Sequence, residues 1–174
     1  MHPFSELAMR CSTITDVLIA DREEYALQAL QESGATTLTK GLQALELQRA
    51  SVAVGMFAML EAALQDALGC AGGFKGAMAL MTGPEEQALR QRFWHVQLAV
   101  NALKHGQGRG YQQLLARRDE LPFEIFSDGD DSEKGDVAAT RTLVRADSAL
   151  LHHCAETIDL VAALVRRRVS NSLA

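Results

Sequence analysis

Apolar side chains recur at helical spacings along most of this chain. Between residues 5 and 32 the apolar positions lie three, four or seven residues apart, which predicts an amphipathic helix that stops at Ser33 and Gly34. These positions are Leu7, Cys11, Ile14, Leu18 and Tyr25. A last helix, from Asp147 or Ser148 to about residue 169, has a stripe of Leu150, Cys154, Ile158, Val161 and Val165. Between the two, spacing and glycine or proline stops predict helices at residues 42–68, 74–81, 84–105 and 111–118.

The helical pattern breaks once, before the last helix. Residues 121–126 and 140–144 are short runs typical of strands, and the loop between them is acidic and contains Gly129 and Gly135. Eight acidic residues and one lysine lie between residues 119 and 136. We therefore predict a small β-hairpin insert at residues 119–146, with a mobile acidic tip at residues 128–136.

These elements predict one all-α domain over residues 1–174, a four- or five-helix up-down bundle with the hairpin inserted before its last helix. A chain of 174 residues buries enough surface for one full core. Its 48% hydrophobic and 22% charged residues are ordinary globular values, which exclude a disordered or collagenous protein. We find no internal repeat.

Cysteine usage and hydropathy predict a soluble cytoplasmic protein with no membrane partner. Cys11, Cys70 and Cys154 are far apart and form no CxxC pair, so neither a disulfide framework nor a thiolate zinc site is expected. The start of the chain lacks a basic region followed by an apolar run. The longest apolar stretch, residues 52–60, is too short to span a bilayer.

The helix at residues 84–105 has two seams. At about 100° per residue, one seam is typical of a core and contains Leu89, Phe93, Val96, Val100 and Leu103. The opposite seam contains Gln87, Gln91, Trp94, Leu98, Asn101 and His105. Because tryptophan is enriched at interfaces, we predict that Trp94 and Leu98 form the interface of a homodimer.

The end of this helix carries the strongest candidate chemistry. Asn101 and His105 are one turn apart, and a histidine at a helix C-terminus can act as an acid or a base near neutral pH. Lys104 and Arg109 flank it, and the glycine-rich turn at residues 106–110 can present backbone amides to an anion. Residues 85–118 hold six Lys or Arg against two Glu, in a chain of net charge −5.

The remaining polar candidates are weaker. Glu61 lies on the same helical face as Phe57, Leu64 and Leu68, where a carboxylate either pairs with Asn101, His105 or an arginine, or sits at the rim in water. His152 and His153 are expected to form a surface pair, and His95 lies on a polar flank. No metal site and no cofactor are predicted, because metal-ligand and cofactor motifs are missing from the sequence.

The run Val100-Asn101-Ala102-Leu103-Lys104-His105-Gly106 resembles the end of the signature helix of HEPN domains, in which an Arg-Asn-x-x-x-His pattern precedes a glycine. Residues 55–64 resemble the long helix that precedes it, and the architecture is similar from about residue 42 onward. Asn101 matches the polar position and His105 the histidine. The position of the arginine is Val100, on the core seam.

The resemblance implies a helical bundle that dimerises through its signature helices and, in catalytic members, a metal-independent endoribonuclease of bacterial defence or toxin–antitoxin systems. We therefore expect an RNA- or nucleotide-handling protein, with Lys104 or Arg109 supplying the cation if it cleaves RNA. The alternative is a non-catalytic dimerisation or partner-binding module. A third hypothesis, a small-molecule sensor, rests only on the apolar character of residues 42–68.

Overall fold

The computed structural model describes residues 2–33, 35–127 and 143–172. The described chain forms six α-helices, joined in places by 3-10 turns at Pro84–Glu86 and Arg118–Glu120. The helices are α1 (His2–Ser33), α2 (Thr36–Leu68), α3 (Gly73–Leu80), α4 (Gln87–His105), α5 (Arg109–Leu115) and α6 (Ser148–Ser172). The all-α prediction is confirmed for these residues. The second helix begins six residues earlier than predicted, so that only two residues separate α1 from α2.

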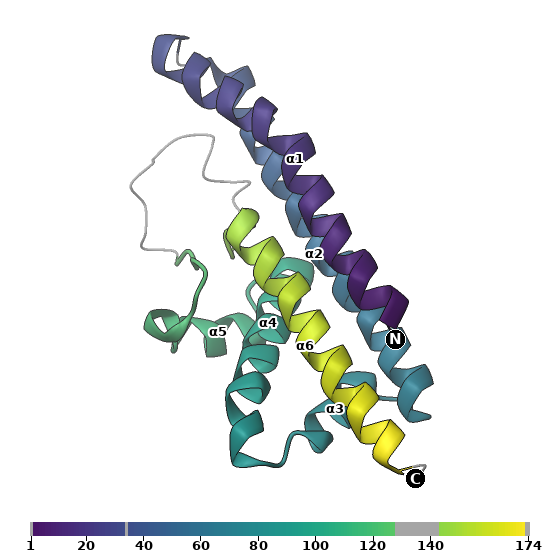
Figure 1. The fold of residues 1–174 in the computed structure, drawn as a ribbon. Coiled ribbons are helices and arrows are strands. Elements are labelled where there is room, and N and C mark those ends of the chain that lie inside the picture. The colour runs from purple at the N-terminus through teal and green to yellow at the C-terminus, as the bar shows by residue number, and fades with distance from the viewer. Residues whose placement is uncertain (1, 34, 128–142, 173–174) are drawn as a thin grey trace.

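The two longest helices form an antiparallel hairpin that dominates the shape of the molecule (Figure 1). The end of the hairpin that holds the α1–α2 turn projects beyond the other helices, while α6 runs along the opposite half and packs against both α1 and α2. Helices α3 and α4 also contact α2 and α6. The core therefore lies where α2, α4 and α6 meet.

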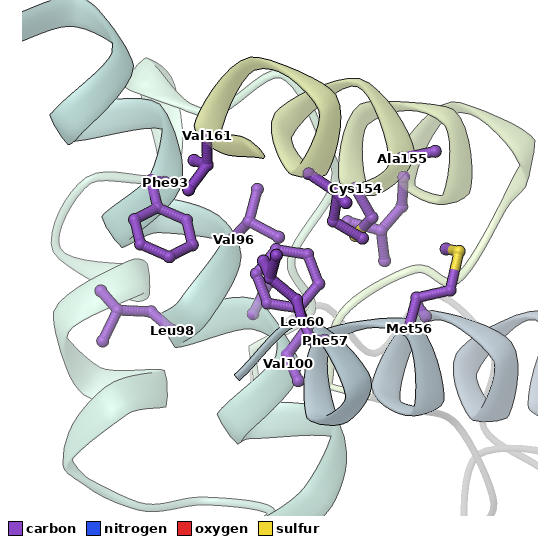
Figure 2. Close-up of a cluster of buried hydrophobic side chains, with 14 of the residues drawn as sticks. Met56, Phe57, Leu60, Phe93, Val96, Leu98, Val100, Cys154, Ala155 and Val161 are labelled. Atoms are coloured by element: carbon purple, nitrogen blue, oxygen red, sulfur yellow. The ribbon is translucent and has the colours of Figure 1, made fainter. Parts of the chain in front are cut away.

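Aromatic and aliphatic side chains from these three helices fill the core (Figure 2). Phe57 of α2 and Phe93 of α4 are almost completely buried, and both contact Phe74 of α3, with ring centroids 6.0 and 5.5 Å away. The predicted stripe of α6 is buried along its whole length, which confirms that part of the pattern. Within it, burial raises the pKa of the Cys154 thiol to about 12, so this thiol is a packing group and not a nucleophile.

Helix α1 packs on the body through its small residues. Leu7, Ile14, Leu18 and Tyr25, whose spacing predicted the helix, are between 58 and 69% exposed. The buried face instead consists of Ser5, Ala8, Ser12, Thr15, Ile19 and Ala26. Amphipathic spacing usually marks the face that meets the core. Here the small residues let α1 approach α2 and α6, and the large apolar stripe faces outward.

A polar network between α1, α2 and α6 fixes this orientation. The guanidinium of Arg49, which is 5% exposed, donates to Glu23 at 2.6 Å and to Asp16 at 3.3 Å. Asp16 also accepts a hydrogen bond from the Ser148 hydroxyl at 2.6 Å and contacts His152 Nε2 at 2.8 Å. Because these partners lie on three helices, the network specifies which face of α1 is buried.

The predicted β-hairpin is not seen in the described residues. Ile125 and Val144 form one isolated antiparallel bridge, with hydrogen bonds from Phe126 N–H to Leu143 and from Arg145 N–H to Glu124. The adjacent Ile125 and Phe126 are both buried, so the side chains do not alternate between two faces as a half-exposed strand requires. The acidic tip at residues 128–136 and the start of the second run at residues 140–142 lie outside the described residues.

Candidate functional site

The candidate site begins where α4 ends, at Gly106. This residue has φ 72° and ψ −146°, a backbone conformation that is essentially restricted to glycine. Its N–H donates to the carbonyl of Ala102 at 2.9 Å, which closes the last turn of α4. The chain then reverses through Gly108, which precedes the first residue of α5. The glycines therefore place the end of α4 and the start of α5 at one corner of the molecule.

Four of the predicted site residues lie at this corner with exposed side chains. Asn101 and His105 occupy the last two turns of α4, Lys104 precedes His105, and Arg109 is the first residue of α5. None of the four takes part in a hydrogen bond or ion pair with another described residue. The corner therefore presents two cations, an imidazole and an amide to solvent, all available to a ligand.

Val100, at the position where the resemblance expects an arginine, is 5% exposed and belongs to the core. The prediction that it lies on the core seam is confirmed. Because Val100 points into the protein, this position of α4 supplies no cation to the corner. Lys104 and Arg109 are the cations that the corner offers to a phosphate.

The predicted interface at Trp94 and Leu98 is covered by the chain itself. Leu98 is 7% exposed, so the prediction that it faces away from the core is wrong. Helix α5 folds back on α4 so closely that a Cβ placed on Gly110 lies 3.6 Å from Leu98 Cδ2. Trp94 is half-buried and carries the guanidinium of Arg117 on its ring. The sequence pattern showed an apolar seam, but not that the following segment packs against it.

Glu61 does not pair with the corner. Its side chain is half-buried on α2, and no hydrogen bond or ion pair joins it to another residue of the described ranges. Of the two environments considered for this carboxylate, the rim of the core face agrees with its position. The predicted supporting role of Glu61 towards Asn101 or His105 is therefore not accompanied by a contact between these side chains in the described residues.

Sequence reasoning missed a pair of histidines between α4 and α6, the buried His95 and the half-buried His153. His95 is 4% exposed, and the Nε2 atoms of both His95 and His153 are buried with no hydrogen-bond partner among the described residues. Burial lowers the pKa of both, that of His153 to about 4, so both rings are neutral near pH 7. The surface-pair prediction is wrong for His153. Ala99 and Ala102 lie on the same side of α4 as His95. These small residues could have indicated that another helix packs closely against this side of α4.

Arg92 holds this contact between helices together. Its guanidinium donates to the hydroxyl of Thr157 at 2.8 Å and to the carboxylate of Glu156 at 2.6 Å. Thr157 is fully buried. These hydrogen bonds position α4 relative to α6. Because the groups already bind one another, they are structural contacts and not a candidate site for a ligand.

A Ser-His-Asp arrangement also occurs, but it is inaccessible. Ser12 Oγ lies 3.1 Å from His152 Nδ1, and His152 Nε2 lies 2.8 Å from Asp16. Because Ser12 is 0% exposed, no substrate can reach its hydroxyl. Within the described ranges, three or more His, Cys, Asp or Glu side chains do not come together in a way that could hold a metal ion.

Helices α2 and α6 contain segments long and apolar enough to cross a membrane, judged by length and composition alone.

Comparison of the chain with family models, curated proteins and solved structures finds no match.

Proposed function

We propose that this protein handles RNA, and that it binds the phosphate backbone at the corner between α4 and α5. The observation that carries the proposal is the exposure of Asn101, Lys104, His105 and Arg109 at one corner with no partner among the described residues. Lysine and arginine supply the sequence-independent part of nucleic-acid affinity, because they neutralise phosphates and release counterions. The HEPN resemblance supports RNA as the nucleic acid.

The same corner has the groups for a metal-independent cleavage. His105 can take the proton of a 2′-hydroxyl, whose oxygen then attacks the adjacent phosphorus and breaks the bond to the 5′-oxygen. Lys104 and Arg109 stabilise the charge that develops on the phosphate oxygens, and the departing 5′-oxygen takes up a proton from water. Since Val100 replaces the arginine of catalytic HEPN members, we place RNA binding first and cleavage second.

Binding is tested with a fluorescent single-stranded RNA over a range of salt concentrations. Lys104→Ala with Arg109→Ala should weaken binding and reduce the slope of log affinity against log salt by about 1.4, from roughly 0.7 per lost phosphate contact. The matched control is Lys40→Ala with Lys75→Ala, which removes two exposed cations on α2 and α3 that have no ion pair among the described residues. Equal losses in both double variants would contradict a specific role for the corner.

Cleavage is tested in the presence of a chelator by following the formation of 2′,3′-cyclic phosphate ends. His105→Ala should abolish that product while the helical content stays unchanged, because the side chain is exposed and makes no hydrogen bond within the described residues. A wild-type protein that neither binds nor cleaves RNA at low salt rules out the proposal.

The second candidate function is a non-catalytic module that acts by dimerisation or by binding a partner protein. A different observation favours it: the exposed apolar stripe of α1, which includes Leu7, Ile14, Leu18 and Tyr25. The two candidates use different surfaces, so one result does not decide the other.

A further inference from the structure

Helix α1 presents a ridge of apolar side chains to solvent, interrupted between Leu18 and Tyr25 by the exposed Asp21 and Arg22. Leu7, Ile14, Leu18 and Tyr25 are 60, 58, 62 and 69% exposed, and Cys11 is exposed between them. At about 100° per residue they share an arc of about 60° that runs for roughly 27 Å along the helix. An exposed row of apolar side chains of this extent marks a contact site on a protein surface. We call these five residues the α1 ridge.

The neighbouring helix α2 has an exposed face without charge. Only 28% of its most apolar 18-residue window is buried. Residues 41–62 span about 31 Å of this helix. Every exposed residue in this span is uncharged, and most are small. These residues are Gly41, Ala44, Leu47, Gln48, Ser51, Ala58, Met59 and Ala62. We call them the α2 face. A helix surface normally carries charges on its solvent side, so this composition indicates contact with another surface.

We propose that a second copy of this chain covers the α1 ridge and the α2 face, so that two hairpins form a four-helix layer about a two-fold axis. A two-fold interface places the same surface of both copies in contact, so that surface must be complementary to itself. Large side chains on one helix and small ones on its neighbour meet this condition, because the α1 ridge of each copy fits against the α2 face of the other. Both strips follow the same hairpin, whose helices lie side by side (Figure 1).

The area and the charges agree with a protein partner. Two helices about 10 Å wide and 30 Å long present roughly 600 Å² in projection, which is the scale of the about 800 Å² that each partner buries in a standard interface. Exposed charges lie within one turn of the α1 ridge, at Arg10, Asp21, Arg22 and Glu24. In a protein dimer Arg10 and Glu24 remain at the hydrated rim, and Asp21 and Arg22, between Leu18 and Tyr25, can face opposite charges of the second copy. Insertion into lipid would bury all four at a cost of several kcal/mol.

The proposed interface is separate from the RNA-binding corner. It uses α1 and α2, while Asn101, Lys104, His105 and Arg109 belong to α4 and α5. It also replaces the interface expected at residues 87–105, where Leu98 is covered by α5. The dimer and the RNA-binding proposal can therefore fail independently.

The test measures the mass of the full chain in solution by analytical ultracentrifugation. The wild type should sediment as a dimer, and Ile14→Asp or Leu18→Asp should raise the dissociation constant roughly thirtyfold or more, the effect of losing one central hot spot. Ala58→Arg tests the α2 face separately, since it places a charge where the partner's ridge should fit. Leu160→Asp is the matched control, because Leu160 is 45% exposed on α6 and lies outside the interface, and it should stay dimeric.

Cys11 supplies a second measurement that needs no disruptive variant. Because it lies on the α1 ridge, its thiol should react with a maleimide more slowly as the protein concentration rises and the dimer forms. A wild type that is monomeric at high concentration overturns the proposal, and so does a dimer that resists all three interface variants. A monomer that floats with vesicles of phosphatidylcholine and phosphatidylglycerol instead assigns the surface to a membrane, and likewise overturns it.

Discussion

The guanidinium carbon of Arg117 lies 4.8 Å from the centroid of the Trp94 ring. The contact joins α4 to the segment that follows α5, and it covers part of the Trp94 ring, which was expected to lie at a homodimer interface. A cation over an indole ring is a favourable electrostatic contact. The only tryptophan of the chain therefore stabilises the fold of one copy.

This contact predicts that loss of the Arg117 side chain lowers the stability of the fold and leaves the oligomeric mass in solution unchanged. Arg117→Ala should lower the free energy of unfolding by about 0.5–1 kcal/mol, the usual range for a partly exposed cation over an aromatic ring. Urea denaturation measures this value, and a double-mutant cycle with Trp94→Leu should recover most of it as coupling. Arg109→Ala, an exposed arginine without a ring contact, should have almost no effect on stability. A shift of the Arg117→Ala variant towards monomer would instead place Trp94 at an interface.

The histidines between α4 and α6, His95 and His153, predict a loss of stability in mild acid. The folded state lowers the pKa of His153 to about 4, whereas the unfolded chain binds a proton near the ordinary value of 6.5. The unfolded state therefore takes up the proton first, and this contribution to stability, complete above pH 6.5, is lost as the pH falls towards 4. Burial lowers the pKa of His95 as well, which acts in the same direction.

Urea midpoints measured at pH 7 and pH 4.5 check this expectation. His153→Leu removes the titrating ring, so its stability should decline less than that of the wild type between the two values. Leu160→Asn, an exposed substitution on the same helix, should keep the wild-type pH profile. Parallel pH profiles for His153→Leu and the wild type would show that the ring is not kept neutral by the fold.

Two glycines at the candidate site predict different costs for the same substitution. Gly106 has φ 72° and ψ −146°, so Gly106→Ala should lower the free energy of unfolding by about 1–3 kcal/mol through backbone strain. Gly108 has φ −116° and ψ −171°, and a Cβ added there meets nothing within 4 Å. Gly108→Ala should therefore change stability by less than about 1 kcal/mol. Thermal or urea unfolding compares the two, and equal costs would be inconsistent with this turn geometry.

The polar network of α1 predicts a large effect from one buried arginine. Arg49→Met leaves Asp16 and Glu23 without their cation between three helices, which should cost about 3 kcal/mol, the lower end for breaking a buried ion pair. Arg145→Met removes an ion pair in which both side chains are about half exposed, and it should cost less than about 1 kcal/mol. Urea denaturation of the two variants gives the comparison. Similar small losses would show that the network does not fix α1.

The sequence by itself determined the local structure. Helix periods depend on residues three and four apart, and helix ends depend on nearby glycines and capping side chains, so both are encoded within short segments. The left-handed glycines Gly69 and Gly106 end α2 and α4 as predicted, and the Asp147 carboxylate accepts the N–H of Leu150 at the start of α6. The same spacing placed Val100 in the core and His105 outside it.

Only the tertiary structure decided which of two apolar faces is buried. Leu98 is covered because α5 folds back on α4, and the α1 ridge is exposed because Ser12 and Asp16 meet α6, more than 130 residues away in the chain. His95 and His153 likewise come together from different helices. Spacing along a helix shows which residues share a face, but the partner of that face is chosen by packing between segments that are distant in sequence. The physical reason is that burial is a property of the assembled helices and is not carried by any one of them.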